Sequence, residues 1–343
     1  MSGRDGSPRA PLHLLACEPA RPLAQRVARH LYTVVGEGCD TWFACGEAKY
    51  DVRENVRGSD VYVFQQAFVP GGERSIYDHF VMLLHAIDAA RCADADRITA
   101  IVPYLPGGRQ DKRKGHAREG VSTGLFARLI AEAGADMLIT VEPHNEATVG
   151  CYDPRKVVFE SVGVTRPFAR YLRQNQLGCD VVASTDVGGL ERARHYAEQL
   201  GTGLAALSKQ RDYSQSSVVT NTTVIGEVAG KSVLVVDDII DTAGSVCAAV
   251  RKLWEEGATD VVVAGVHVLL SGPGPERLQA LHDDATRRGV TLRVVGTSSV
   301  EHPELPDWYA SWPLEPLLAD VIRSVNRRGS VRAVEEDRAD AEP

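Results

Sequence analysis

The 343-residue sequence lacks cysteine pairs, long apolar runs and an excess of positive charge. Its seven cysteines are scattered without a Cys-x-x-Cys pair, which argues against a zinc site and favours free thiols in a reducing compartment. No apolar stretch approaches the roughly 18 residues of a membrane helix, and the first residues lack the apolar core of a signal peptide. The net charge of −8 argues against general nucleic-acid binding. We therefore expect a cytoplasmic protein that binds neither nucleic acid nor a membrane.

What the sequence contains is an alternation of apolar strands and amphipathic helices. Its length, with 44% hydrophobic and 24% charged residues, suits a globular protein of about two domains. Buried strands are predicted at 12–17, 42–43, 60–64, 97–104, 137–141, 180–184, 204–207, 218–225, 233–236 and 261–268. Helices are predicted at 23–31, 76–91, 122–133, 190–200 and 314–327. This alternation predicts an α/β fold with mostly parallel sheets covered by helices.

The most informative stretch runs from a buried strand through an acidic end into a helix. The apolar strand 233–236 leads directly into Asp237 and Asp238, and Asp241 follows after two apolar residues. A helix follows the next four residues, with apolar side chains at 246, 249, 250, 253 and 254 and a natural stop at Gly257. The intervening loop therefore lies at the carboxyl end of a strand, where open α/β sheets bind ligands.

This loop has the chemistry of a sugar-phosphate site. Thr242 and Ser245 offer hydroxyl groups, and Gly244 lets a ligand approach the backbone closely. The start of the helix presents unpaired N–H groups that suit a phosphate, whereas the neighbouring carboxylates suit ribose hydroxyls or Mg²⁺. Two alternatives are an acidic strand end that is merely solvated and a phosphoacceptor receiver domain, which would not need this loop.

Further polar residues follow other predicted strands. A basic, glycine-rich loop at 107–118 comes after the strand 97–104, and His144 follows the strand 137–141. We expect this loop to meet a triphosphate and His144 to lie at the same rim, in a metal or phosphate role. The alternatives are a solvated or nucleic-acid-binding basic loop and a histidine that is satisfied within its own loop.

The strand 180–184 and the strand after it also end in candidate residues. Asp186 is followed by Gly188 and Gly189, which permit a tight turn into a helix that Asp186 could instead cap. Lys209 and Arg211 alternate beyond the strand 204–207, so they would share one face and suit a transferring phosphoryl group. The alternative for these two cations is a solvated strand edge.

Taken in order, these motifs resemble those of the ribose-phosphate pyrophosphokinases (PRPP synthetases) over about residues 12–330. The matching segments are 21–28, 54–61, 103–111, 186–189, 224–230, 237–245 and 270–273. The resemblance implies two type I phosphoribosyltransferase-like domains, each a mostly parallel sheet flanked by helices. It places an ATP-binding domain at 11–160, with a flexible basic loop at 105–118, and a ribose 5-phosphate domain at 161–330. Residues 1–10 are expected to be disordered, and residues 331–343 to form a solvated acidic tail.

The resemblance also implies a reaction and the residues that carry it. The family transfers the diphosphoryl group of Mg²⁺-ATP to the 1-hydroxyl group of ribose 5-phosphate, forming PRPP and AMP for nucleotide biosynthesis. The implied ATP-binding residues are Phe43, Cys45, Gly46, Glu47, Arg109 and Gln110. The implied Mg²⁺ ligands are His144 and Asp186, and the implied catalytic residues are Lys209 and Arg211. The implied ribose 5-phosphate residues are Arg211, Asp237, Asp238, Asp241, Thr242, Ala243, Gly244 and Ser245.

The resemblance further implies a homo-oligomer, a hexamer assembled from dimers, in which the nucleotide site borrows residues from a neighbouring subunit. Several positions depart from the family pattern: Cys45 stands where aspartate is usual, Gln210 replaces an arginine, and Ser245 replaces a threonine. The changes at Cys45 and Gln210 leave open a catalytically weak or regulatory subunit that acts through a true synthetase. A phosphoribosyltransferase, which shares the phosphate-loop motif but is shorter, is the other alternative.

Overall fold

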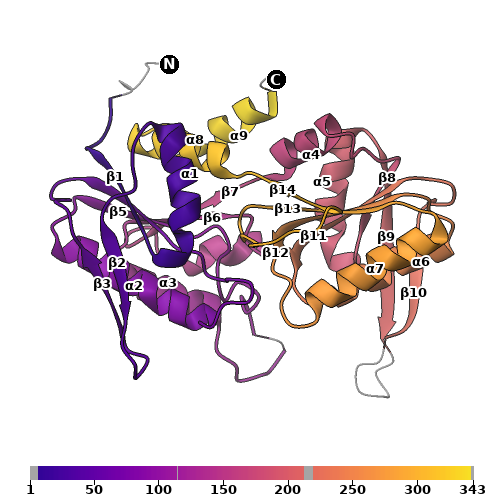
Figure 1. The fold of residues 1–343 in the computed structure, drawn as a ribbon, viewed down its shortest axis with the longest axis horizontal. Helices are drawn as coiled ribbons and strands as arrows, with labels where there is room; N and C mark the ends of the chain where they lie inside the picture. The colour runs from indigo at the N-terminus through magenta and orange to yellow at the C-terminus, as the bar shows by residue number, and fades with distance from the viewer. Residues whose placement is uncertain (1–6, 114, 212–218, 341–343) are drawn as a thin grey trace. The chain divides into compact units, whose positions relative to one another are not determined.

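The computed structural model describes residues 7–113, 115–211 and 219–340, without the side chains of 209–211, 219–221 and 337–340. The chain divides into two compact units (Figure 1). Unit 1 comprises residues 1–163, 298–301 and 313–343, and unit 2 comprises residues 164–297 and 302–312. The boundary therefore follows Gly163, and residues 313–330, which the sequence analysis assigned to the second domain, fall in unit 1.

Unit 1 is built on a parallel five-stranded sheet in the order β1-β4-β5-β6-β7. Its strands are β1 (Leu12–Ala16), β4 (Asp60–Phe64), β5 (Arg97–Ile101), β6 (Met137–Val141) and β7 (Val158–Val162). Helices α1 (Arg21–Leu31) and α8 (Glu315–Asn326) lie on one face, and α2 (Ile76–Cys92) and α3 (Ser122–Glu132) on the other (Figure 1). All residues of β4, β5 and β6 are buried, because helices cover both faces.

Helix α8 belongs to unit 1 because its polar side chains find their partners there. The Glu315 carboxylate accepts a hydrogen bond from Arg26 of α1, against which α8 packs. At the other end, the Asn326 side chain donates to the Asp60 carboxylate of β4 over 2.9 Å and to the Ala10 carbonyl over 3.2 Å. The contact with Ala10 ties down part of the segment 1–10 that the sequence predicted to be disordered, while residues 1–6 lie outside the described residues.

The predicted acidic tail is partly helical. Helix α9 (Val331–Asp340) packs against α8 and β7, and Val331 is buried. The Glu335 carboxylate accepts a hydrogen bond of 2.6 Å from the N–H of Gly163, and burial raises the pKa of Glu335. The tail is therefore not solvated throughout, because Val331 and Glu335 have packing partners in unit 1, although Arg332 and Ala333 are exposed. Residues 341–343 lie outside the described residues.

Unit 2 is built on a seven-stranded sheet in the order β10-β9-β8-β11-β12-β13-β14. Its strands are β8 (Val181–Ser184), β9 (Gly203–Arg211), β10 (Val219–Ile225), β11 (Val233–Ile240), β12 (Val261–Val268), β13 (Leu292–Thr297) and β14 (Tyr309–Trp312). The strands are parallel except for β10, which is antiparallel to β9. Helices α4 (Thr165–Gln174) and α5 (Leu190–Leu200) cover one face, and α6 (Gly244–Glu255) and α7 (Gly274–Arg288) cover the other (Figure 1).

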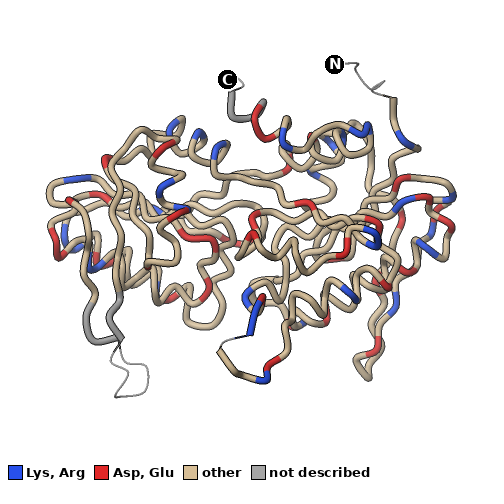
Figure 2. Tube along the Cα trace, turned by 180° about the vertical axis from the view of Figure 1, so that it is seen from behind, with Lys and Arg blue, Asp and Glu red and all other residues tan. Residues whose placement is uncertain are grey.

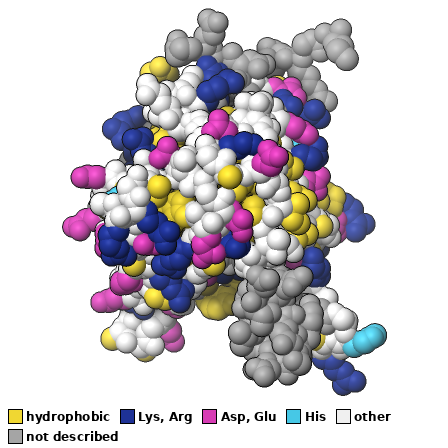
Figure 3. Space-filling view, turned by 90° about the vertical axis from the view of Figure 1, so that its right-hand side faces the viewer, with side chains coloured by type: hydrophobic (Ala, Val, Ile, Leu, Met, Phe, Trp, Pro, Cys, Tyr) yellow, Lys and Arg dark blue, Asp and Glu magenta, His cyan; other side chains and the backbone are white. Residues whose placement is uncertain are grey.

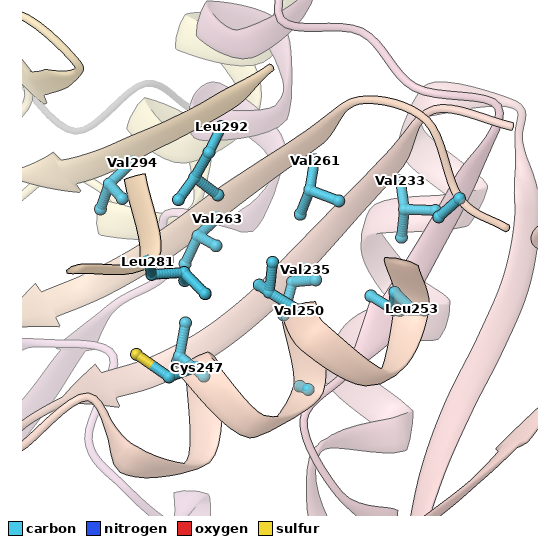
Figure 4. Packing of buried hydrophobic residues seen from close by; sticks show 14 of the residues in the cluster. Val233, Val235, Cys247, Val250, Leu253, Val261, Val263, Leu281, Leu292 and Val294 are labelled. Carbon is cyan, nitrogen blue, oxygen red and sulfur yellow. The ribbon is translucent and has the colours of Figure 1, made fainter. Parts of the chain in front are cut away.

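Strand β11 shows how one apolar run supplies both cores of unit 2. Val233 and Val235 pack into a cluster with Leu253 of α6 and residues of α7 (Figure 4). Leu234 and Val236 belong to the opposite cluster, which includes residues of α4 and α5. Successive side chains of a strand point to opposite faces, so a continuous apolar run indicates a strand that is covered on both sides. The predicted α/β class with mostly parallel sheets is thereby confirmed.

Some elements differ from the prediction. The sequence predicts no element at β7, α4, α7, β13, β14 or β3 (Ala48–Val52), which forms a hairpin with β2 (Gly38–Trp42). Strand β11 continues past its predicted end at Val236 to Ile240, because its pairing with β12 continues to that residue.

Among the described residues, no helix combines the length and the apolar character needed to cross a membrane.

Candidate active site

The sheet of unit 2 has a topological switch point between β8 and β11. From β8 the chain moves outward to β9 on one side, whereas β11, β12 and β13 follow in order on the other side. Open α/β sheets bind ligands outside the carboxyl ends of the strands at such a point. The segments that leave β8 and β11 here are 185–189 and 241–245, so both carry candidate residues of the sequence analysis.

Asp237 lies in β11 one residue beyond the last pairing with β8. Its carboxylate accepts hydrogen bonds of 3.0 Å from the Thr185 hydroxyl and of 3.0 Å from the N–H of Asp238. Burial, followed by the Asp238 side chain, raises the pKa of Asp237 to about 7, and Thr185 and Arg192 act in the opposite direction. This carboxyl group therefore exchanges its proton near neutral pH, at the point where a ligand is expected.

Asp238 has a different environment although it is the next residue. It is 6% exposed, and its Oδ1 lies 3.3 Å from Nη1 of Arg192 on α5. Adjacent strand residues point to opposite faces, which places Asp238 on the α5 side of the sheet. The sequence predicts that both carboxylates bind the sugar, and in the structure Asp238 also has an internal arginine partner.

The loop after β11 is shorter than predicted, because β11 ends at Ile240 and α6 begins at Gly244. Ala243 precedes the helix with a left-handed φ of 56°, a strained conformation that often marks functional turns. The N-cap residue of α6, Ala243, provides no side-chain hydrogen bond to the first N–H groups of the helix, and Thr242 and Ser245 beside them are exposed. Uncapped N–H groups next to exposed hydroxyls suit an anionic ligand.

Asp186 follows β8 and begins a short 3-10 turn, η3 (Val187–Gly189). Its carboxylate accepts a hydrogen bond of 3.1 Å from the N–H of Gly189, so Asp186 caps η3, whereas the N-cap residue of α5 is Gly189, which provides no side-chain cap. The preceding residue, Thr185, bonds to Asp237, which joins this turn to the end of β11. The role of Asp186 as a metal ligand stays a prediction.

Lys209 and Arg211 lie on an extension of β9 that is longer than predicted. Strand β9 pairs with β8 as far as Ala206 and then continues beside β10, where Lys209 stands opposite Thr222 and Arg211 opposite Val219. Their side chains lie outside the described residues. The prediction that the two cations share one face for phosphoryl transfer therefore stays a prediction.

In unit 1, the basic loop and the loop after β6 lie together. The Asn145 side chain donates to the Asp111 carboxylate, and a Cβ atom on Gly108 would lie 3.9 Å from the Cβ atom of His144. The Gln110 side chain donates to the Gly120 carbonyl over 3.2 Å, which closes the loop on itself. Basic residues recur along this loop, between β5 and α3 (Figure 2). His144 thus shares a rim with the basic loop, as the order of the strands predicted.

Four of the predicted ATP-binding residues, Phe43, Cys45, Gly46 and Glu47, lie in the turn of the β2–β3 hairpin. The N–H of Phe43 donates to the Glu47 carbonyl over 2.8 Å, and Gly46 adopts a left-handed φ of 94° in the turn. Phe43 is 48% exposed, so part of its ring is accessible to a base, and Cys45 is exposed beside it. The Arg74 guanidinium lies 4.3 Å from the centroid of the preceding Trp42 ring, which ties the hairpin to the segment before α2.

Comparisons with known proteins identify the family of this chain. A profile of the N-terminal domain of ribose phosphate pyrophosphokinase matches residues 12–134, and a phosphoribosyl transferase domain profile matches residues 162–297. The ribose-phosphate pyrophosphokinase of Helicobacter pylori is 34% identical over 310 residues, which cover 90% of this chain and 92% of that protein. The chain belongs to the ribose-phosphate pyrophosphokinase family.

Other members of the pyrophosphokinase family agree. The ribose-phosphate pyrophosphokinase of Synechococcus elongatus is 36% identical over 294 residues, which cover 85% of this chain and 83% of that protein. The crystal structure of phosphoribosylpyrophosphate synthetase from Mycobacterium smegmatis matches with a TM-score of 0.81 and 32% identity, covering 93% of this chain and 100% of that one. The predicted family and the predicted enzyme class, a transferase, are therefore confirmed.

Some residues around the site of this pyrophosphokinase-family chain escaped the sequence analysis. Thr185 and Arg192 hold the acidic end of β11, Ser271 donates to the Asp241 carboxylate, and Nη1 of Arg277 donates to the Thr242 carbonyl over 3.0 Å. These partners are 30 to 52 residues apart in sequence, so spacing could not reveal them. Thr185 directly precedes the segment 186–189, and Ser271 lies within the segment 270–273, and both segments resemble the family. No sequence signal pointed to Arg277.

Proposed function

We propose that this chain transfers the diphosphoryl group of ATP to the 1-hydroxyl group of ribose 5-phosphate, forming PRPP and AMP for nucleotide biosynthesis. The observation that carries the proposal is the junction of β11 and α6, with uncapped N–H groups, exposed hydroxyls and a nearby carboxylate. The N–H groups and hydroxyls suit the 5-phosphate, and the carboxylate accepts hydrogen bonds from ribose hydroxyls. Relatives that match most of the chain carry the name of this activity.

In this proposal unit 2 holds the sugar phosphate and unit 1 supplies the nucleotide-binding residues. Ribose 5-phosphate is bound by Arg211, Asp237, Asp238, Asp241, Thr242, Ala243, Gly244 and Ser245. ATP is bound by Phe43, Cys45, Gly46, Glu47, Arg109 and Gln110. Lys209 and Arg211 neutralise the charge on the transferring group, because phosphoryl-type transfer depends on alignment and electrostatic stabilisation more than on covalent help.

Mg²⁺ is part of the proposal, with His144 and Asp186 as its protein ligands. Mg²⁺ keeps several water ligands and binds through few protein groups together with substrate phosphates. Among the described residues, no group of three or more His, Cys, Asp or Glu side chains could hold a metal ion, so in this proposal substrate phosphates and water complete the coordination of Mg²⁺. When bound, the ion neutralises phosphate charge and orients the oxygens. The cap to Gly189 holds the Asp186 carboxylate in a fixed orientation.

The proposal includes a homo-oligomer, a hexamer as the resemblance implies, in the cytoplasm. Helices α2 and α3 of unit 1 carry exposed apolar side chains that a second copy could cover, namely Tyr77, Val81, Leu125 and Leu129. The cysteines are free, which suits a reducing compartment. Basic and acidic side chains are interspersed on the face of unit 2 that Figure 3 shows, which does not favour nucleic-acid binding.

An assay for AMP tests the reaction directly. The purified chain, incubated with ATP, Mg²⁺ and ribose 5-phosphate, should form AMP and PRPP in equal amounts, and omission of any one component should stop both. Absence of AMP with every pentose phosphate and nucleotide tried would contradict the proposal. Consumption of PRPP together with a free base would instead indicate a phosphoribosyltransferase.

A second candidate is a regulatory subunit of weak activity, which the residues Cys45 and Gln210 favour. The variant Lys209→Ala separates the two. For an enzyme we expect kcat to fall roughly 10²- to 10³-fold, because a charge that stabilises the transition state is lost. If Lys209→Ala kept the biological effect of the wild type in the cell, or its effect on a partner synthetase, the hypothesis of a regulatory subunit would be supported.

A further inference from the structure

A segment that contains none of the proposed substrate-binding residues packs against the proposed phosphate-binding loop 241–245, and we call this segment the wall. It consists of residues 270–277, which follow β12 and begin α7. The Ser271 hydroxyl donates to the Asp241 carboxylate, and Nη1 of Arg277 donates to the Thr242 carbonyl over 3.0 Å. The N–H of Leu270 donates to the Ile240 carbonyl over 3.3 Å. The wall therefore contacts β11 and the loop at three successive points.

The packing between the wall and the loop leaves little room for movement. A Cβ atom on Gly274 would lie 2.8 Å from the Asp241 carbonyl oxygen, closer than such contacts allow. A Cβ atom on Gly244 would lie 3.3 Å from Nη1 of Arg277, so this glycine also makes room for the guanidinium. The Cys247 thiol of α6 donates to the Arg277 carbonyl at 3.6 Å, which joins the two helices. These contacts fix where the guanidinium lies.

The charge balance of the loop explains why a cation is needed there. Asp237 and Asp241 flank the loop, and a phosphate monoester adds close to two negative charges. Apart from the Asp241 carboxylate, the loop contributes N–H groups, hydroxyls and the positive end of a helix dipole. Arg277 is exposed, lies against the loop and forms no salt bridge within the described part of the chain. Its charge therefore remains available to an anion.

We propose that Arg277 is a further substrate-binding and positioning residue, which recognises the 5-phosphate of the sugar phosphate. One of its five N–H donors contacts the loop through the Thr242 carbonyl, which leaves other donors for the phosphate in this proposal. A guanidinium suits this double task, because its donors form a rigid planar fork. The inference rests on the proposed function, since it takes the loop to be the phosphate site.

The test compares Arg277→Ala and Arg277→Lys with Arg287→Ala as a matched control. Arg287 lies on the last turn of the same helix, 3.5 Å from Asp284, away from the loop. We expect Arg277→Ala to raise the KM for ribose 5-phosphate roughly 10- to 100-fold, the range for loss of a charged hydrogen bond, with an unchanged KM for ATP. Lysine should restore part of this loss, and Arg287→Ala should match the wild type.

Unphosphorylated ribose separates phosphate recognition from simple support of the loop. Arg277→Ala should affect the slow reaction with ribose much less than the reaction with ribose 5-phosphate, provided that thermal unfolding shows a folded variant. An unchanged KM for ribose 5-phosphate, or an equal loss with both sugars, would overturn the inference. If the wild type formed no AMP, the proposed function would fail instead. Calorimetric binding of ribose 5-phosphate to the wild type and to Arg277→Ala would then decide the inference, with equal affinities refuting it.

Discussion

The titration of Asp237 gives the sharpest prediction about the acidic end of β11. Asp237→Asn keeps the size of the side chain and removes the carboxyl group whose pKa burial and Asp238 raise to about 7. The folded chain keeps this proton to a higher pH than the unfolded chain does. The contribution to stability is therefore fully present below the ordinary pKa of 3.8 and is lost as the pH rises through about 7. In the asparagine variant this loss should be absent.

The size of the effect follows from the shift itself. A rise from 3.8 to about 7 is about three pKa units, and each unit corresponds to 1.36 kcal/mol, which gives about 4 kcal/mol. Relaxation around the charged carboxylate reduces this value, so we expect on the order of 2–4 kcal/mol between pH 4 and pH 8. Such a change is a large share of the roughly 5–15 kcal/mol that stabilise most domains.

Denaturant unfolding at several pH values measures this contribution. The wild type should lose more unfolding free energy between pH 4 and pH 8 than Asp237→Asn, and the difference between the two curves isolates the one carboxyl group. Thr185→Val provides a matched test, because it removes a hydrogen bond that lowers the pKa of Asp237. In Thr185→Val, the loss of unfolding free energy should occur at a higher pH than in the wild type. Parallel curves for the wild type and Asp237→Asn would refute the reasoning.

Two further predictions concern the core of unit 2 and the nucleotide hairpin. Leu253→Ala should lower the free energy of unfolding by about 2–5 kcal/mol, because Leu253 is fully buried between α6 and the sheet (Figure 4), whereas the exposed Leu305→Ala should change it little. Equal effects of the two changes in denaturant unfolding would contradict this packing. Phe43→Ala should raise the KM for ATP roughly tenfold, since stacking on a base contributes about 1–3 kcal/mol, and Phe43→Tyr should keep it. A KM that Phe43→Ala leaves unchanged would remove this ring from the nucleotide site.

The sequence revealed those parts of the fold and site that depend on neighbouring residues. Asp237 could be found because it directly follows an apolar run, but its partner Thr185 lies just beyond the end of β8, 52 residues earlier. Helix α7 was missed because only Leu278, Leu281 and Ala285 give it a buried apolar stripe. Because α8 follows the strands of the second domain in the chain, the sequence predicted that it belongs to that domain. In the structure, Asn326 of α8 instead contacts Asp60, 266 residues earlier. Partners that folding brings together leave no trace in local spacing.

The alternation of strand faces explains why two adjacent aspartates have different environments. Val233 and Val235 of β11, and Val181 and Ala183 of β8, face α6 and α7. Thr185 and Asp237 continue these two rows at the point where β8 ends, so their side chains meet on the α6 and α7 side.

Asp238 continues the other row of β11, toward α5, and finds Arg192 there. The sheet face that packs against α6 and α7 inside unit 2 thus carries the candidate site where the strands end. Asp241, Ser271 and Arg277 lie on the same side. Asp237 and Asp238 are therefore not interchangeable. The Asp237 carboxylate contacts Thr185 on the side of α6 and α7, whereas the Asp238 carboxylate contacts Arg192 of α5.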